Sequence, residues 1–163
     1  MVPPEKGDVN NLSLRAGPTR AFSVNEEISV ILIQTEPLDI EAELGSFREG
    51  HSDYGALASF GGYVRQEDGQ VTGLELQHYP GVTEAEIARY ELMAFQRFDL
   101  QDCLIIHRVG RILPTEAIVL VAVLARHRKP ALEAVDFLMD HLKTSAPFWK
   151  KQIGPDGETW VEP

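Results

Sequence analysis

The sequence contains one cysteine, Cys103, in 163 residues, and this scarcity excludes two kinds of site. A single cysteine cannot form an internal disulfide, and with five scattered histidines it cannot build a zinc site. Cys103 opens the apolar run Cys-Leu-Ile-Ile, so we expect a buried core thiol rather than a nucleophile. We therefore expect no metal ligands and no cofactor.

Long apolar runs and an excess of basic charge are also missing. The longest apolar run, Ala117–Ala125, is far shorter than the roughly 18 residues that a membrane span needs. The N-terminus lacks a basic-then-apolar signal pattern, so we expect a cytoplasmic protein. Asp and Glu outnumber Lys and Arg by 25 to 15, and the resulting net charge of −10 argues against general nucleic-acid binding. The sequence has no P-loop, dinucleotide fingerprint or serine nucleophile elbow.

Apolar periodicity predicts one α+β domain over residues 28–163, a mainly antiparallel sheet with packed helices. Residues 1–27 are rich in Pro, Gly and Asn without periodicity, which predicts a flexible tail. The predicted strands cover 28–34, 55–64, 71–79, 104–108, 117–125 and 160–162. The predicted helices cover 38–47, 83–98 and 130–143. Turn and loop structure is expected at 110–116 and 144–152.

Two of these helices have recognisable ends. Thr83 and Glu86 have the spacing of a capping box, which predicts that the second helix starts at Thr83. Pro130 suits the first turn of the third helix, and Pro147 disfavours helical geometry just before it, so that helix should stop near Lys143. The third helix carries a stripe that we predict to be buried, made of Leu132, Val135, Met139 and Leu142.

The stretch from Arg126 to Lys151 is basic on an acidic chain, with six Lys and Arg against three Asp and Glu. Such an island suggests an anion site, although solvated surface cations explain it as well. Two ammonium groups that lie close together and are partly buried disfavour each other's charge, which would suit Lys143 and Lys150 for proton transfer. In the alternative interpretation, Lys143 is an ordinary cation at a helix C-terminus. We interpret His107-Arg108 as a structural pair at a strand end.

Several blocks of sequence are more specific than any of these patterns. They are Phe-Gly-Gly-Tyr-Val-Arg (60–65), Leu-Gln-His-Tyr-Pro-Gly-Val-Thr-Glu (76–84), Ile-His-Arg-Val-Gly (106–110), His-Arg (127–128), Phe-Leu-Met-Asp-His-Leu-Lys-Thr-Ser-Ala-Pro-Phe-Trp-Lys (137–150) and Trp-Val-Glu (160–162). With these blocks in this order, the chain resembles the large, catalytic subunit of molybdopterin synthase over most of its length.

The resemblance implies an enzyme that inserts two dithiolene sulfurs into cyclic pyranopterin monophosphate, called precursor Z, to make molybdopterin. The sulfur would arrive as a thiocarboxylate on the C-terminal Gly-Gly tail of a small ubiquitin-like subunit. Two large subunits would form the central homodimer of a heterotetramer. The catalytic positions of the family fall on Lys143 and Lys150. Its substrate-binding positions fall on Tyr63, Val64, Arg65, His127, Arg128, Lys143, Lys150, Lys151 and Gln152.

The chain departs from the family pattern at two places in these blocks. Members commonly carry Thr-Gly-Lys before Val-Arg, where this chain has Gly61-Gly62-Tyr63 and so lacks one cation. Lys129 follows His-Arg, where Ser or Thr is common, and this lysine restores the lost charge. The alternative from a different class is a non-catalytic pterin- or phosphate-binding protein that keeps the anion pocket. A purely structural dimer module is a third alternative, against which the paired lysines argue.

Overall fold

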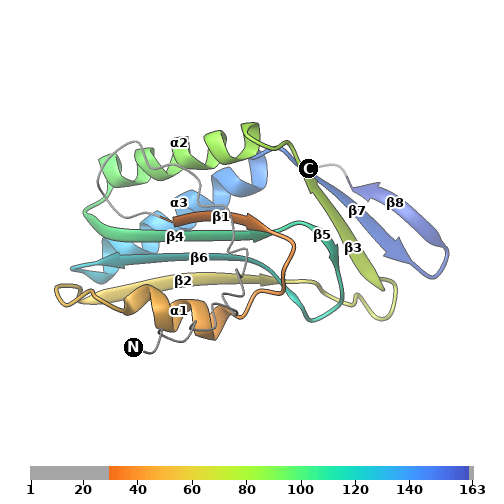
Figure 1. The fold of residues 1–163 in the computed structure, drawn as a ribbon, viewed down its shortest axis with the longest axis horizontal. Coiled ribbons are helices and arrows are strands. Elements are labelled where there is room, and N and C mark those ends of the chain that lie inside the picture. Colours follow the sequence, from red (N-terminus) through yellow and green to blue (C-terminus); the bar gives the residue numbers. More distant parts are fainter. Residues whose placement is uncertain (1–29, 162–163) are drawn as a thin grey trace, which may run out of the picture.

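The computed structural model describes residues 30–161, which form two four-stranded sheets and three helices (Figure 1). Of the strand pairs in this part of the chain, only β1 with β4 is parallel, so the predicted α+β fold with mainly antiparallel pairing is confirmed. The predicted tail at 1–27, the start of the predicted strand at 28–34 and the end of that at 160–162 lie outside the described residues.

The first sheet has the strand order β1-β4-β6-β2, with β6 at its centre. β6 is apolar at every position and almost entirely buried, because both faces of the sheet are covered. This confirms the predicted covered central strand. The strands are β1 (Val30–Gln34), β4 (Leu100–Arg108), β6 (Ala117–Ala125) and β2 (Ala56–Tyr63).

The helices divide between the two faces of this sheet (Figure 1). On one face, α2 and α3 pack against a core that includes Ile105, Val121 and Val123. On the other face, α1 packs against Ile106 and Leu120. The helices are α1 (Ile40–Arg48), α2 (Val82–Arg97) and α3 (Arg128–Thr144). No helix among residues 30–161 is long and apolar enough to cross a membrane.

The second sheet is antiparallel throughout, with the order β5-β3-β7-β8. Its small core consists of apolar side chains from β3, β5 and the segment that leaves β2, namely Val64, Val71, Leu74, Leu76 and Ile112. β8 is exposed along its whole length. The strands are β5 (Gly110–Ile112), β3 (Gly73–His78), β7 (Phe148–Gly154) and β8 (Gly157–Val161).

Two segments expected to be turn and loop are strands. The predicted turn at 110–116 begins with β5, and the predicted loop at 144–152 becomes β7 from Phe148 onward. β7 has adjacent aromatics followed by adjacent lysines, so its sequence lacks the alternation of a half-buried strand. The hydrogen bonds that make it a strand come from β3 and β8, and pairing with distant residues is invisible to local periodicity.

The predicted N-cap of α2, Thr83, is wrong by two residues, although the helix itself starts at Val82. The N-cap is Gly81, whose φ of +83° suits glycine, and its N–H donates to the Glu84 carboxylate at 2.7 Å. The hydroxyl of Thr83 instead accepts from the N–H of Tyr79 at 3.0 Å and donates to the carbonyl of Pro147 at 3.2 Å. Thr83 therefore ties the start of α2 to the segment that follows α3.

The predicted apolar stripe of α3 is partly wrong. Leu132 is 61% exposed, and Met139 is only partly buried. The buried residues are Ala131, Ala134, Val135, Leu138 and Leu142. The face of the helix that contacts the sheet therefore includes two alanines that the predicted stripe left out. Small side chains allow the helix to lie close against the sheet, and an alanine pair does not stand out in a search for large apolar residues. The helix also begins at Arg128 rather than Pro130.

We predict that Leu138→Ala lowers the free energy of unfolding by about 2–5 kcal/mol, because Leu138 is only 1% exposed and its removal leaves a cavity under α3. Leu132→Ala, on the same helix, is the matched control and should change stability by less than about 0.5 kcal/mol. Denaturant unfolding of both variants measures the difference. Equal losses would show that the buried face of α3 is wrongly assigned.

Candidate active site

Helix α3 separates two groups of predicted site residues. His127 is its N-cap and Arg128 its first residue, whereas Lys143 lies in its last turn. With a rise of about 1.5 Å per residue, Arg128 and Lys143 are about 22 Å apart along the axis. Figure 1 shows α3 running along the first sheet toward its junction with the second. One protomer therefore cannot place Arg128 and Lys143 around the same small molecule.

Lys143 and Lys150 lie on either side of a short, well-anchored segment. The carbonyl of Pro147 accepts a hydrogen bond from the Thr83 hydroxyl. The ring of Phe148 stacks on the ring of His107, with centroids 3.9 Å apart and planes inclined by 14°. Lys150 sits on β7, between Leu76 of β3 and Val161 of β8. Both lysines thus belong to the junction of α3 with the second sheet. Lys143 itself is exposed, so the partial burial expected for it is not found.

The predicted run Lys150-Lys151-Gln152 does not share one face, since neighbouring side chains on a strand point to opposite sides. Lys150 and Gln152 lie on the face of Leu76. Lys151 lies on the other face, where its Nζ is 2.8 Å from Glu158 and 5.0 Å from the centre of the Trp160 ring. The hydrogen bond from Lys151 lowers the pKa of Glu158. Lys151 therefore contributes to the pairing of β7 with β8.

The predicted residues 63–65 lie at the end of β2, of which Tyr63 is the last residue, on the side of the second sheet. Tyr63 is 53% exposed, and the Arg65 side chain is 83% exposed with Nη2 3.1 Å from Glu67. Val64 differs from both, because only 3% of it is exposed and both its N–H and its C=O are bonded to the turn at 113–116. The backbone and side chain of Val64 are therefore held in place, whereas the side chains of Tyr63 and Arg65 are exposed to solvent.

The residues before α3 lie against the loop at 49–55. Arg126 pairs with Asp53 at 2.9 Å, while His127 and Arg128 are exposed. The same loop is fixed to β4 by His51, whose Nε2 is 2.8 Å from the buried Asp102 carboxylate. Burial raises the pKa of that carboxyl, although the Cys103 N–H and His51 oppose the shift. The backbone at Arg128 therefore has a defined position, at the end of the first sheet that lies away from the second sheet.

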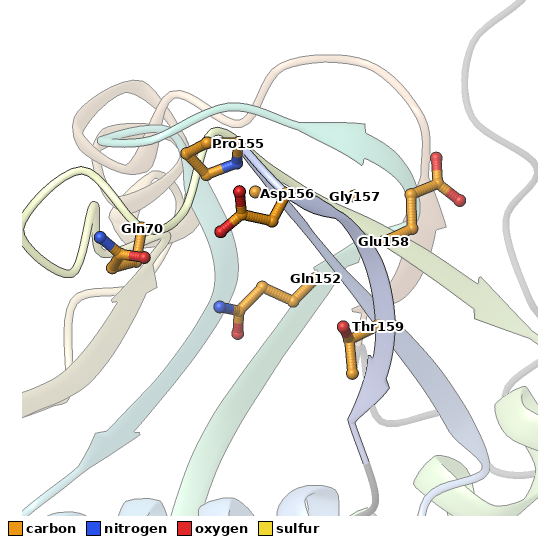
Figure 2. A pocket seen from close by; sticks show the side chains of 8 residues that line it. Gln70, Gln152, Pro155, Asp156, Gly157, Glu158 and Thr159 are labelled. Carbon is orange, nitrogen blue, oxygen red and sulfur yellow. The ribbon is translucent and has the colours of Figure 1, made fainter.

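A hollow of about 210 Å³ lies beside the turn between β7 and β8 (Figure 2). Gln152 and Thr159 line it, together with Asp156 and Glu158. Two acidic groups make it unsuited to a phosphate, and neither Lys143 nor Lys150 lines it. In residues 30–161, no three His, Cys, Asp or Glu side chains lie close enough together to hold a metal ion.

Sequence reasoning missed the two contacts that hold the Lys143–Lys150 segment, from Thr83 and from His107. The sequence pattern predicted a structural role for His107, which is partly buried, but did not reveal that its ring stacks on Phe148. Burial lowers the pKa of His107 to about 4, and the neighbouring His78 acts in the same direction. Its Nδ1 donates to the carbonyl of Arg108 at 2.8 Å, so the neutral ring stacks on Phe148.

The pairing of charges distinguishes some of these cations from the rest. Arg65, Arg126, Lys129 and Lys151 each face a carboxylate. Within residues 30–161, no carboxylate lies within ion-pair distance of Arg128, Lys143 or Lys150, on a protein whose net charge is −10. On this α+β fold, Arg128, Lys143 and Lys150 are therefore the predicted site cations that remain available to attract an anion.

Comparison with known proteins identifies the family of the chain. A family model described as "MoaE protein" matches residues 33–145. The "Molybdopterin synthase catalytic subunit" of Mesorhizobium japonicum is 48% identical over 134 residues, covering 81% of this chain and 84% of that protein. The protein of the same name from Caulobacter vibrioides is 47% identical over 134 residues, covering 82% and 89%. The solved structure of the "Molybdopterin biosynthesis MoaE protein" from Burkholderia ambifaria matches with a TM-score of 0.72 and 46% sequence identity, covering 82% of this chain and 89% of that one.

The chain belongs to the MoaE family. The prediction of a molybdopterin synthase catalytic subunit, a sulfur-transferring enzyme of molybdenum cofactor biosynthesis, is confirmed.

We predict that the partly buried His107 makes the protein less stable in acid. The unfolded side chain titrates near 6.5 and the folded one near 4, so between these values only the unfolded state binds the proton. The free energy of unfolding should fall as the pH drops from 6.5 to 4, by up to about 3 kcal/mol from this residue. His107→Asn places an amide nitrogen where Nδ1 lies, so it can still donate to Arg108 and should lack this part of the slope. Denaturant unfolding across that range measures it, and identical slopes would exclude His107 as the cause.

Proposed function

We propose that Lys143 and Lys150 carry out sulfur transfer to precursor Z at the junction of α3 with the second sheet. The observation that carries this proposal is the pair of cations without a carboxylate partner in the described chain, on either side of the segment fixed by Thr83 and His107. A thiocarboxylate is an anion, and an acidic protein would otherwise repel it. The ammonium groups of Lys143 and Lys150, one on each side of that segment, would provide the attraction.

The two lysines have different settings, which suggests different roles. Lys143 is exposed at a helix end and can orient the thiocarboxylate and stabilise charge that develops as its sulfur is transferred. Lys150 is held on a strand between two neighbours, so its backbone is fixed. It can donate a proton to the oxygen that leaves the pterin.

The sulfur would come from a separate small subunit. The relatives are named catalytic subunits, which supports a second kind of subunit in the assembly. Its extended Gly-Gly tail has to reach Lys143, so we place the tail along the exposed end of α3 and the start of β7. The expected cytoplasmic location of the reaction stays a prediction.

We assign the cyclic phosphate of the substrate to Arg65 and to Arg128 with its neighbour His127. A guanidinium offers a planar fork of donors to phosphate oxygens. Arg65 leaves β2 at the end nearest the second sheet, whereas Arg128 lies about 22 Å from Lys143. Arg128 can therefore serve this site only from a second copy of the chain, so the site is incomplete in one protomer.

The outer edge of β2 offers a route to such a dimer. β2 is the last strand of its sheet, and in the described residues its outer side pairs with no strand. If two copies pair antiparallel through β2, the Tyr63 end of one strand lies beside the Ala56 end of the other. Ala56 is paired with Ala125, immediately before Arg126. The pairing would thus bring Arg128 of the second copy toward Arg65 of the first.

The alternative function is a non-catalytic protein that binds a pterin or another phosphate with the same cations. It shares the anion site, so binding alone cannot separate it from the enzyme. A requirement for the chemistry of Lys143, beyond its charge, distinguishes the two.

We predict that Lys143→Ala loses nearly all sulfur transfer in a single-turnover assay with the thiocarboxylated small subunit. Lys143→Arg should fail as well, because guanidinium has a different shape and stays protonated. Both variants should still bind the small subunit in a titration. Arg48→Ala, which removes an exposed cation from the last turn of α1, is the control and should transfer normally. Near-normal transfer by Lys143→Arg would reduce Lys143 to a positive charge.

We also predict that the chain is a dimer in solution at micromolar concentration, because a site that needs Arg128 from a second copy requires one. Sedimentation equilibrium with and without the small subunit measures the state of assembly. A monomer that transfers sulfur at the full rate would contradict the shared site.

A further inference from the structure

We propose that Glu116, beside the buried Arg108, is a positioning residue for substrate binding. It fixes the turn at 113–116 against Val64, and Val64 in turn sets where Arg65 is presented. The inference rests on the proposed function, which assigns the phosphate of the substrate to Arg65.

The turn at 113–116 contains a residue in a costly backbone conformation. Thr115 has a φ of +71°, a region that a β-branched side chain rarely adopts. The turn is closed by the N–H of Glu116, which donates to the carbonyl of Leu113 at 3.1 Å. Strain of this kind persists only where surrounding interactions over-determine the geometry, and it often accompanies function.

Val64 is bonded to this turn on both sides of its backbone. Its N–H donates to the carbonyl of Glu116 at 3.0 Å, and its carbonyl accepts the N–H of Thr115 at 2.9 Å. Thr115, the residue with the positive φ, is therefore also the residue whose N–H donates to Val64 and fixes its backbone. The side chain of Val64 is buried in the core of the second sheet, so Val64 is held at three points.

The side chain of Arg108 contacts both Glu116 and Ala117, at the end of the turn. Its side chain, at the end of β4, is only 5% exposed, with Nη1 3.3 Å from the carbonyl of Ala117 and 3.5 Å from Oε2 of Glu116. The same Glu116 oxygen accepts the N–H of Leu113 at 2.8 Å. One carboxylate therefore joins the buried cation to the first residue of the turn.

The burial of Arg108 is costly, which points to a role other than stability. Its Nε is buried and has no hydrogen-bond partner in the described chain, and Glu116 is its one carboxylate there. A buried ion pair is often replaceable by apolar side chains without loss of stability. In this site the guanidinium fixes a strained turn, and an apolar side chain of equal volume could not do so.

The consequence for Arg65 follows from its place in the chain. Arg65 comes directly after Val64, and its own side chain is exposed and paired only with the exposed Glu67. The backbone of Val64 therefore sets the point from which the Arg65 side chain extends toward a ligand. A planar fork binds phosphate oxygens well only when its direction is fixed, and small displacements cost affinity.

The first test is a double-mutant cycle in steady-state kinetics, using the full chain with its thiocarboxylated small subunit and precursor Z. Glu116→Ala should raise KM for precursor Z by about tenfold, as loss of one charged contact does, with kcat lowered less than about threefold. In an Arg65→Ala background, Glu116→Ala should raise KM no further. Glu86→Ala, which breaks an exposed pair on α2, is the control and should leave KM unchanged.

Position 115 provides a matched pair of variants in case Glu116→Ala folds poorly. Glycine adopts positive φ without strain, so Thr115→Gly should keep the turn and leave KM unchanged while stability stays equal or rises. Proline cannot adopt that φ and has no N–H for the Val64 carbonyl, so Thr115→Pro should raise KM as Glu116→Ala does.

The outcomes separate the two proposals. Should Glu116→Ala or Thr115→Pro raise KM equally with and without Arg65, or lower only the unfolding temperature, the turn is structural and the positioning role is refuted. Should Arg65→Ala itself leave KM unchanged, the assignment of the phosphate to Arg65 is wrong, and the positioning role falls with it.

Discussion

The rigidity of α3 is the constraint on which the site depends. The helix packs through Ala131, Ala134 and Leu138 along the first sheet, so its two ends are fixed at opposite ends of that sheet. The pair His127-Arg128 is thereby separated from Lys143 by about 22 Å. A protein that uses both ends in one reaction has to assemble the site from two copies. The geometry of one packed helix thus leads to an argument about quaternary structure.

The site is built from backbone pairing more than from a preformed cavity. Lys150 gains its position from β3 and β8, and Arg65 gains its position from Val64 and the turn beyond it. The hollow near β8 is lined by Asp156 and Glu158 and lies away from the two lysines. We infer that the partner tail and the second copy supply walls that one chain does not provide.

The sequence revealed chemistry better than it revealed geometry. The motif around Lys143 and Lys150 identified the family, and the uninterrupted apolar run of β6 predicted a covered central strand. The strand β7 escaped prediction because its hydrogen-bond partners lie far away in the sequence. The buried face of α3 was partly misassigned because alanines, and not Leu132, face the sheet. Each error arose where a distant partner decided the outcome.

The anchoring contacts could not be predicted for a related reason. Thr83 has the spacing of a helix cap, yet its hydroxyl bonds to Pro147, 64 residues further on. In the sequence, Arg108 resembles any cation at a strand end, and only the structure shows that it is buried beside Glu116. Local rules assign such residues to the nearest element, whereas the fold uses them to join separate segments.

The shared site is tested most directly by mixing two inactive variants. Arg128→Ala and Lys143→Ala would each disable every site in their own dimers. Refolded together, they would form mixed dimers in which one site has Arg128 from one copy and Lys143 from the other. We predict that the mixture regains about one quarter of the normal rate of sulfur transfer, because half the dimers are mixed and each has one intact site. No recovery, with mixed dimers shown to form, would contradict a site shared between two copies.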